Sequence, residues 1–145
     1  MLLFPARRAP SRDGGEEAGG HSPSEGVFQG TKILVVEDDF IVAFDMQSIL
    51  EEQGAQVLGP ASSVREAQAL LAAHTPQAAV LDVNLNGEFV FPLVELLRAK
   101  GVPFLFATAY ADDDRLFPES TRQVPKLAKP VLPAALLAQV KKLLG

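Results

Sequence analysis

The chain has 145 residues, of which 48% are hydrophobic and 21% are charged, a composition that suits one globular domain with a single core. Its net charge of −5 argues against direct nucleic-acid binding, for which a basic surface is usual. Cysteine is absent from the sequence, which excludes disulfides, thiolate metal sites and cysteine nucleophiles. Every apolar run is shorter than the roughly 18 residues of a membrane helix, so we expect a cytoplasmic protein without a membrane segment.

The first 30 residues form a separate compositional block. Two Gly-Gly pairs, three prolines and scattered serines and charges leave few apolar side chains to bury. Such a composition predicts a segment without a packed core and without chemistry of its own. We therefore expect a disordered N-terminal tail over residues 1–30 and one folded domain over residues 31–145.

Short apolar runs alternate with helical patterns along the rest of the chain. The apolar runs are typical of strands buried on both faces, and they predict strands over residues 33–36, 56–58, 78–81, 102–107 and 124–128. Residue types that are common at the first and last turns of helices indicate four helices. They are expected over residues 39–53, from Ser62 or Ser63 onward, over residues 88–100 and from Pro133 onward. Residues 111–123 contain three aspartates and few apolar side chains, which predicts a short or irregular fourth helix.

Five strands that alternate with helices predict an α/β fold with a parallel sheet. Right-handed crossovers place the first, third, fourth and fifth strands side by side. Functional residues of such sheets collect at the carboxyl ends of the strands. We expect one pocket there, because four predicted strands end in polar groups, namely Glu37-Asp38-Asp39, Asp82-Val83-Asn84, Thr108-Ala109-Tyr110 and Lys129-Pro130.

The expected pocket contains the groups that phosphoryl transfer requires. Neighbouring carboxylates repel one another unless a cation lies among them, and Mg²⁺ prefers such oxygen ligands while it retains waters that phosphate oxygens displace. A carboxylate beside Mg²⁺ can act as a nucleophile and form an aspartyl-phosphate, and a lysine and a hydroxyl can stabilise the transferring group. Taken singly, Asp38 or Asp82 could cap a helix or a turn; their joint position favours a site.

Together, these motifs resemble the receiver domain of two-component response regulators. The resemblance covers residues 31–145 and rests on Val35-Val36-Glu37-Asp38, Leu81-Asp82, Thr108 and Lys129-Pro130. It implies a flavodoxin-like (βα)5 fold, a three-layer sandwich whose parallel sheet has the order 2-1-3-4-5. The implied function is Mg²⁺-dependent transfer of a phosphoryl group from a sensor histidine kinase or a phosphotransfer protein, which switches protein–protein interactions rather than performing enzymatic turnover.

The resemblance implies the members of the metal site. Asp82 would be the phosphoacceptor and also a metal ligand, and Asp38 would be the direct ligand of Mg²⁺. Glu37 would act through metal-bound water. The main-chain carbonyl of Asn84 would complete the site.

The resemblance also concerns activation. Thr108 would be the switch hydroxyl that moves onto the phosphoryl group, and Lys129 would be the ammonium that pairs with it. Most receivers have an aromatic residue three positions before this lysine, where this chain has Lys126. The usual coupled rotation of threonine and aromatic is therefore in question, and Tyr110 is a candidate substitute.

Residues 81–88 and 104–110 resemble more closely the FATGUY branch of receivers. Members of that branch are often single-domain and often work with kinases of the HWE type. The branch normally has glycine after the switch threonine. Here that position is Ala109, so we expect the backbone of the loop after the fourth strand to have less conformational freedom.

The helical pattern of residues 39–53 predicts an exposed aromatic pair. Val42 and Met46 fall on the face that would pack on the sheet, and Phe40 and Phe44 point nearly opposite. Exposed aromatic residues beside the expected phosphorylation site predict a docking surface for a kinase. The alternatives are a rotated helix or a tail that covers the pair.

Two other functions fit parts of the pattern. A phosphorylation-independent interaction module of the same fold is favoured by the changes at Ala109 and Lys126, although the intact set of Asp38, Asp82, Thr108 and Lys129 weighs against it. A phosphohydrolase of the haloacid dehalogenase type would have two aspartates, one residue apart, after its first strand. Here the corresponding motif follows the third strand and its second acid is Asn84.

Overall fold

Five parallel strands form the central sheet in the computed structural model, which describes residues 26–145. The strands are β1 (Lys32–Val36), β2 (Gln56–Ala61), β3 (Ala78–Leu81), β6 (Phe104–Thr108) and β7 (Lys126–Ala128). Their order in the sheet is β2-β1-β3-β6-β7. This is the predicted flavodoxin-like order, since β4 and β5 belong to a separate hairpin.

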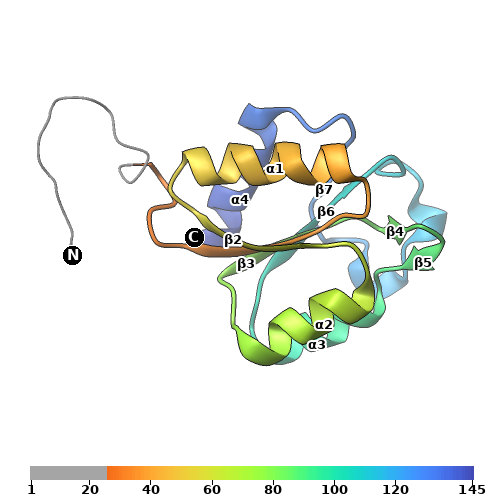
Figure 1. Ribbon diagram of the computed structural model, residues 1–145. Coiled ribbons are helices and arrows are strands. Elements are labelled where there is room, and N and C mark those ends of the chain that lie inside the picture. The colour runs from red at the N-terminus through yellow and green to blue at the C-terminus, as the bar shows by residue number, and fades with distance from the viewer. Residues whose placement is uncertain (1–25) are drawn as a thin grey trace, which may run out of the picture.

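Two pairs of helices enclose this sheet (Figure 1). One face is covered by α1 (Phe40–Glu52) and α4 (Pro133–Leu144), and the other by α2 (Val64–Ala73) and α3 (Pro92–Ala99). Local signals set where the helices begin: the Asp39 carboxylate accepts hydrogen bonds from two amides of the first turn of α1, and Ser63 accepts one from Glu66. Prolines open α3 and α4, where a missing N–H costs nothing.

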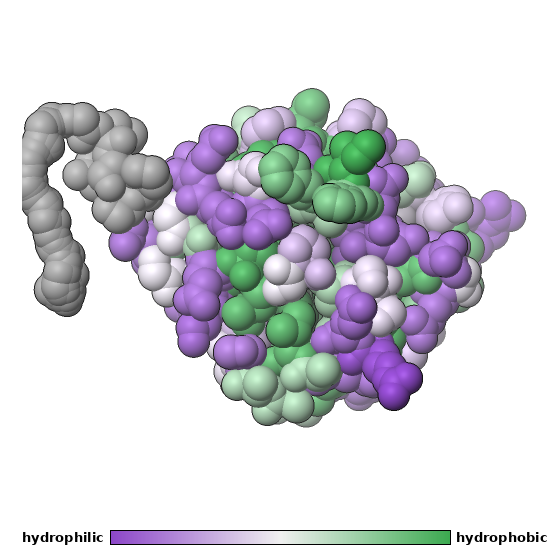
Figure 2. All heavy atoms as spheres, viewed as in Figure 1, coloured by the Kyte–Doolittle hydropathy of each residue, from purple (hydrophilic) through white to green (hydrophobic). Residues whose placement is uncertain are grey.

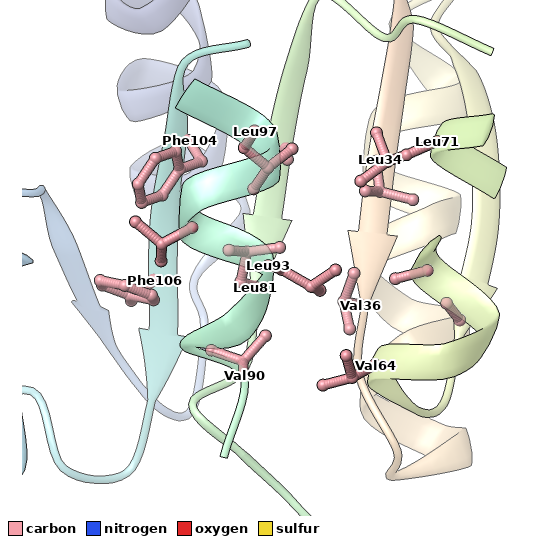
Figure 3. Packing of buried hydrophobic residues seen from close by; sticks show 14 of the residues in the cluster. Leu34, Val36, Val64, Leu71, Leu81, Val90, Leu93, Leu97, Phe104 and Phe106 are labelled. Carbon is pink, nitrogen blue, oxygen red and sulfur yellow. The ribbon is translucent and has the colours of Figure 1, made fainter. Parts of the chain in front are cut away.

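The core consists of one apolar layer on each face of the sheet. Successive side chains of a strand point to opposite faces, so Leu34 and Val36 of β1 join the layer under α2 and α3, while Ile33 and Val35 join the layer under α1 and α4. Figure 3 shows the first of these layers, with Leu81 of β3 beside the helices. Because both layers are buried, β1, β3 and β6 are rigid supports for the residues that follow them.

A small hairpin follows β3 and corrects one prediction. Residues 88–89, predicted as the start of a helix, form β5 (Glu88–Phe89), which pairs antiparallel with β4 (Asn84–Leu85). The turn residues Asn86 and Gly87 both have positive φ, 56° and 94°, as a two-residue type I′ hairpin turn requires. The helix therefore begins only at Pro92.

The segment between β6 and β7 lacks a regular helix. It contains two 3₁₀ turns, η2 (Asp114–Leu116) and η3 (Glu119–Thr121), separated by Phe117 and Pro118. The predicted short or irregular fourth helix is confirmed. The segment is held to the core by the buried side chains of Phe117 and Thr121.

Residues before the predicted boundary at residue 31 take part in the described fold. Phe28 is buried in the layer under α1 and α4, and its amide donates a hydrogen bond to the Gln53 carbonyl at 2.7 Å. The rest of the predicted tail, residues 1–25, lies outside the described residues. Within residues 26–145, none of the helices has the length and apolar character needed to cross a bilayer.

Candidate functional site

Three carboxylates meet at the carboxyl ends of two adjacent strands. Glu37 and Asp38 directly follow β1, and Asp82 directly follows β3. One oxygen from each of the three lies within 4.8 Å of the others. Glu37 and Asp82 are buried, with 2% and 7% of their surface exposed, and Asp38 is the more accessible. The sheet thus brings together the acids that the strand-end pattern predicted.

Lys129 reaches these carboxylates from the other side. It follows β7, two strands away from β3, and its long side chain crosses the end of β6. Its Nζ donates a hydrogen bond to Oδ2 of Asp82 at 3.1 Å and lies 2.6 Å from Oε1 of Glu37. Burial by itself would lower the pKa of Lys129, but its contact with Glu37 and the charge of Asp82 raise that pKa above its usual value. The lysine is therefore a permanent cation in the site.

The two buried carboxylates differ in how they are hydrogen-bonded. Oδ1 of Asp82 accepts the amide of Val83 at 2.7 Å, and Oε2 of Glu37 accepts the amide of Asp39 at 3.0 Å. Oε1 of Glu37 is buried and, apart from its ion pair with Lys129, has no hydrogen-bond partner among the described residues. Burial raises the pKa of Glu37 to about 7, although the contacts with Lys129 and Asp39 act in the opposite direction.

This arrangement fits a hard divalent cation. Three carboxylates face a single ammonium, so the cluster has an excess of negative charge, and Oε1 of Glu37 is an oxygen that a cation or its bound water could satisfy. The side chain of Asn84 accepts the Gly87 amide in the hairpin turn at 2.7 Å. Asn84 therefore has its main-chain carbonyl, rather than its side chain, to offer to a metal.

Thr108 ends β6 between the carboxylates and Lys129. Its side chain is fully buried, its Oγ1 accepts the amide of Tyr110 at 3.1 Å, and its carbonyl accepts the amide of Lys129 at 3.1 Å. Tyr110 is 44% exposed on the loop that follows. The predicted switch hydroxyl therefore lies at the site, and the predicted substitute aromatic lies beside it on the surface.

Lys126 has a different environment from the other predicted switch residues. Its Nζ donates to the carbonyl of Thr121, the last residue of η3, at 3.2 Å, and to those of Arg122 and Val124, which follow η3, at 2.9 Å each. The same ammonium lies 4.6 Å from the centre of the Phe117 ring, a cation–π contact. Lys126 thus holds the segment between β6 and β7.

The predicted aromatic pair is exposed on α1. Phe40 and Phe44 have 77% and 63% of their surface exposed, and Ile41 between them has 80%; Figure 2 shows apolar surface above this helix. A groove beside the pair reaches the acidic site, and it is lined by Glu37, Asp38, Phe40, Ala43, Phe44, Gln47, Pro60 and Ser62. Sequence reasoning did not anticipate Pro60 and Ser62, because the strand before them was predicted to end at residue 58.

Comparison with known sequences gives matches over most of the chain. The family model of the response regulator receiver domain matches residues 33–141. The phyllosphere-induced regulator PhyR of Methylorubrum extorquens is 30% identical over 138 residues, which are 92% of this chain and 49% of PhyR. The chain spans less than half the length of the curated relatives that it matches.

Solved structures of PhyR and SdrG are also similar to this chain. The crystal structure of PhyR from Brucella abortus is 28% identical, with a TM-score of 0.69, over 84% of this chain and 50% of that one. The solution structure of SdrG from Sphingomonas melonis Fr1 is 33% identical, with a TM-score of 0.69, over 80% of this chain and 98% of that one. A solution structure of SdrG from Pseudomonas melonis Fr1 in its BeF3-activated conformation is 32% identical, with a TM-score of 0.67, over 81% of this chain and 98% of that one.

Proposed function

The chain belongs to the response regulator receiver domain family, and we propose that it accepts a phosphoryl group on Asp82 from a sensor histidine kinase or a phosphotransfer protein, with Mg²⁺ as cofactor. The observation that carries the proposal is the buried Asp82 carboxylate, hydrogen-bonded to Lys129 within a cluster of three acids. The BeF3-activated conformation described for SdrG is consistent with a relative that responds to a phosphoryl mimic. The domain assists its own phosphorylation and dephosphorylation and is not a turnover enzyme.

The proposed step is an in-line displacement at phosphorus. An oxygen of the Asp82 carboxylate forms a bond to phosphorus while the P–N bond of a phosphohistidine breaks, and the electron pair of that bond stays on the imidazole nitrogen. Lys129 neutralises charge on the transferring group, and the hydroxyl of Thr108 donates to one of its oxygens. When bound by the carboxylates of Asp38 and Asp82 and the carbonyl of Asn84, with Glu37 acting through metal-bound water, Mg²⁺ would supply further positive charge to the phosphoryl oxygens.

Intact-mass measurement tests the proposal directly. After incubation with acetyl phosphate and Mg²⁺, we expect the wild-type chain to gain one phosphoryl group, because a small phosphodonor needs only the site and not a docking surface. The gain should disappear in Asp82→Asn, which lacks the nucleophilic oxygen, and after chelation of the metal. If the wild-type chain takes up no phosphoryl group from acetyl phosphate or from a phosphorylated kinase, a phosphorylation-independent interaction module of the same fold is the better description.

The exposed pair on α1 predicts how the phosphodonor is recognised. We propose that Phe40 and Phe44, beside the groove that reaches the acidic site, form the docking surface for the kinase, which by resemblance would be of the HWE type. Phe44→Ala should slow phosphotransfer from a phosphorylated kinase about tenfold, the usual effect of truncating an aromatic anchor. It should leave the rate with acetyl phosphate unchanged.

The stability of the same variant serves as the control. Because Phe44 is largely exposed, its truncation should change the free energy of unfolding by less than about 0.5 kcal/mol. A large loss of stability together with unchanged transfer from the kinase would show that Phe44 is a packing residue and not a docking residue.

A further inference from the structure

A row of aromatic rings connects the hairpin after Asp82 with the segment between β6 and β7. Phe89 of the hairpin stacks on Phe91, with ring centres 6.0 Å apart. Phe91 in turn meets Phe117 edge-on at 6.0 Å and Phe106 at 5.9 Å. Beyond Phe117 lies the ammonium of Lys126. The rings therefore form a continuous series of contacts from the hairpin to Lys126, which binds η3 and the turn after it.

The other end of this row is tied to the phosphoacceptor through the main chain. The amide of Val83 donates to Oδ1 of Asp82, and the carbonyl of Val83 accepts the amide of Val90 at the base of the hairpin, at 2.9 Å. Phe89 and Phe91 flank Val90 on both sides. Val83 thus links the Asp82 carboxylate to the residue between the two rings.

The segment at the far end has little regular secondary structure. It has two short 3₁₀ turns in place of a helix. Side-chain contacts hold it in place: Lys126 binds three of its carbonyls and the Phe117 ring, and Arg98 binds the carbonyl of Ser120 at 2.7 Å. An element with few regular hydrogen bonds costs little to rearrange. The Lys126 ammonium is occupied by these carbonyls.

We propose that phosphorylation of Asp82 reaches η3 and the residues that follow it, 119–124, through the β4–β5 hairpin and the row Phe89–Phe91–Phe117, and not through a side chain at position 126. The proposal rests on the proposed function, since it needs a change at Asp82. Phe91 is the central member, because it is the ring that touches both the hairpin side and the segment side. A perturbation of Phe91 with separate readouts at both ends of the row tests this coupling.

Amide NMR spectra of the full chain, with and without BeF3⁻ and Mg²⁺, provide these readouts. The Val83 amide reports on the site, because it bonds to Asp82, and the amides of Glu119–Thr121 report on the segment. In the wild type, we expect both sets to shift. In Phe91→Leu, Val83 should shift as before, while the shifts of the segment should be largely lost.

Two further variants make the result specific. Phe28→Leu is the matched control: it also removes an aromatic ring, but this ring is buried in the layer under α1 and α4, on the opposite face of the sheet from the row, so the segment should respond as in the wild type. Phe89→Ala breaks the row at an exposed ring and should also weaken the response of the segment, which covers the case that Phe91→Leu fails to fold.

The outcomes separate this proposal from the function on which it rests. A full response of the segment in the folded Phe91→Leu or Phe89→Ala variant would overturn the proposed route, and so would a wild-type segment that stays unchanged while Val83 shifts. If Val83 does not shift in the wild type, the phosphoacceptor role of Asp82 fails first, and the route fails with it.

Discussion

A Lys129→Met variant should take up a phosphoryl group from acetyl phosphate about 100-fold more slowly than the wild type, the usual cost of removing one charged or hydrogen-bonding group from a developing transition-state charge. Methionine keeps most of the length of the side chain but removes the ammonium that lies beside Asp82 and Glu37. The rate of mass gain under identical donor and Mg²⁺ concentrations measures the effect. Lys141→Met, at an exposed lysine of α4, is the matched control and should react at the wild-type rate.

The same variant should also change stability, because Lys129 is the cation beside two buried carboxylates. Removal of one partner from a buried ion pair typically costs about 3–5 kcal/mol, and we expect a loss toward the lower end of that range, since about a fifth of the Lys129 side chain is exposed. The loss should shrink in acid, where the carboxyls take up protons. A variant that is as stable as the wild type near neutral pH and that phosphorylates at the wild-type rate would contradict both roles.

The carboxyl ends of the strands could be predicted because a run of buried apolar residues is followed there by polar residues. The residues of β3 and β6 are all buried, as are all but the first of β1, so their sequences are plain apolar runs. The first polar residues after them, such as Glu37 and Asp82, are therefore visible as boundaries. The parallel topology then brings those boundaries to one edge, which is why the site could be predicted without a structure.

Features that depend on sheet position or on distant partners were not predictable. The second strand was predicted to end at residue 58, but β2 continues to Ala61. It contains Pro60, which is tolerated because β2 is an edge strand, where the missing N–H of a proline removes no hydrogen bond from the sheet interior. Phe28 stands in a polar, glycine-rich stretch, and only the packing of α1 and α4 provides its pocket. The hairpin did have a local signal, the pair Asn86-Gly87, which the helical spacing farther along the chain outweighed.

Lys126 illustrates a residue whose role is set by tertiary structure alone. Its sequence position indicated only that the aromatic residue usual at that place in receivers is missing. Its three carbonyl acceptors lie at the end of η3 and in the turn that follows it, just before Lys126 in the chain. The structure thus identifies a restraint on the segment between β6 and β7, while the part that Tyr110 plays in activation stays a prediction.

Glu37 makes the metal-free protein sensitive to pH in a defined direction. Its pKa in the folded chain is about 7, above the ordinary value of 4.5, so the folded state binds a proton that the unfolded state has already released. Its favourable contribution to stability is fully present below about pH 4.5 and is lost as the pH rises through about 7. The raised pKa of Glu37 corresponds to on the order of 3 kcal/mol in the free energy of unfolding. Heat or denaturant unfolding without metal should therefore show a stability that falls over this range.

Mg²⁺ should reverse this trend, because the cation and the proton compete for the same buried carboxylate. With a pKa of about 7 for Glu37, the apparent affinity for Mg²⁺ should be close to its maximum near pH 8, about tenfold weaker near pH 6 and about 100-fold weaker near pH 5. Calorimetric titration at each pH measures this affinity, and binding near pH 6 should release close to one proton. Glu37→Gln cannot bind that proton, so its affinity should be weaker at high pH but nearly constant between about pH 6 and 8. An equally steep pH dependence in Glu37→Gln would show that another group of the cluster controls access of the cation.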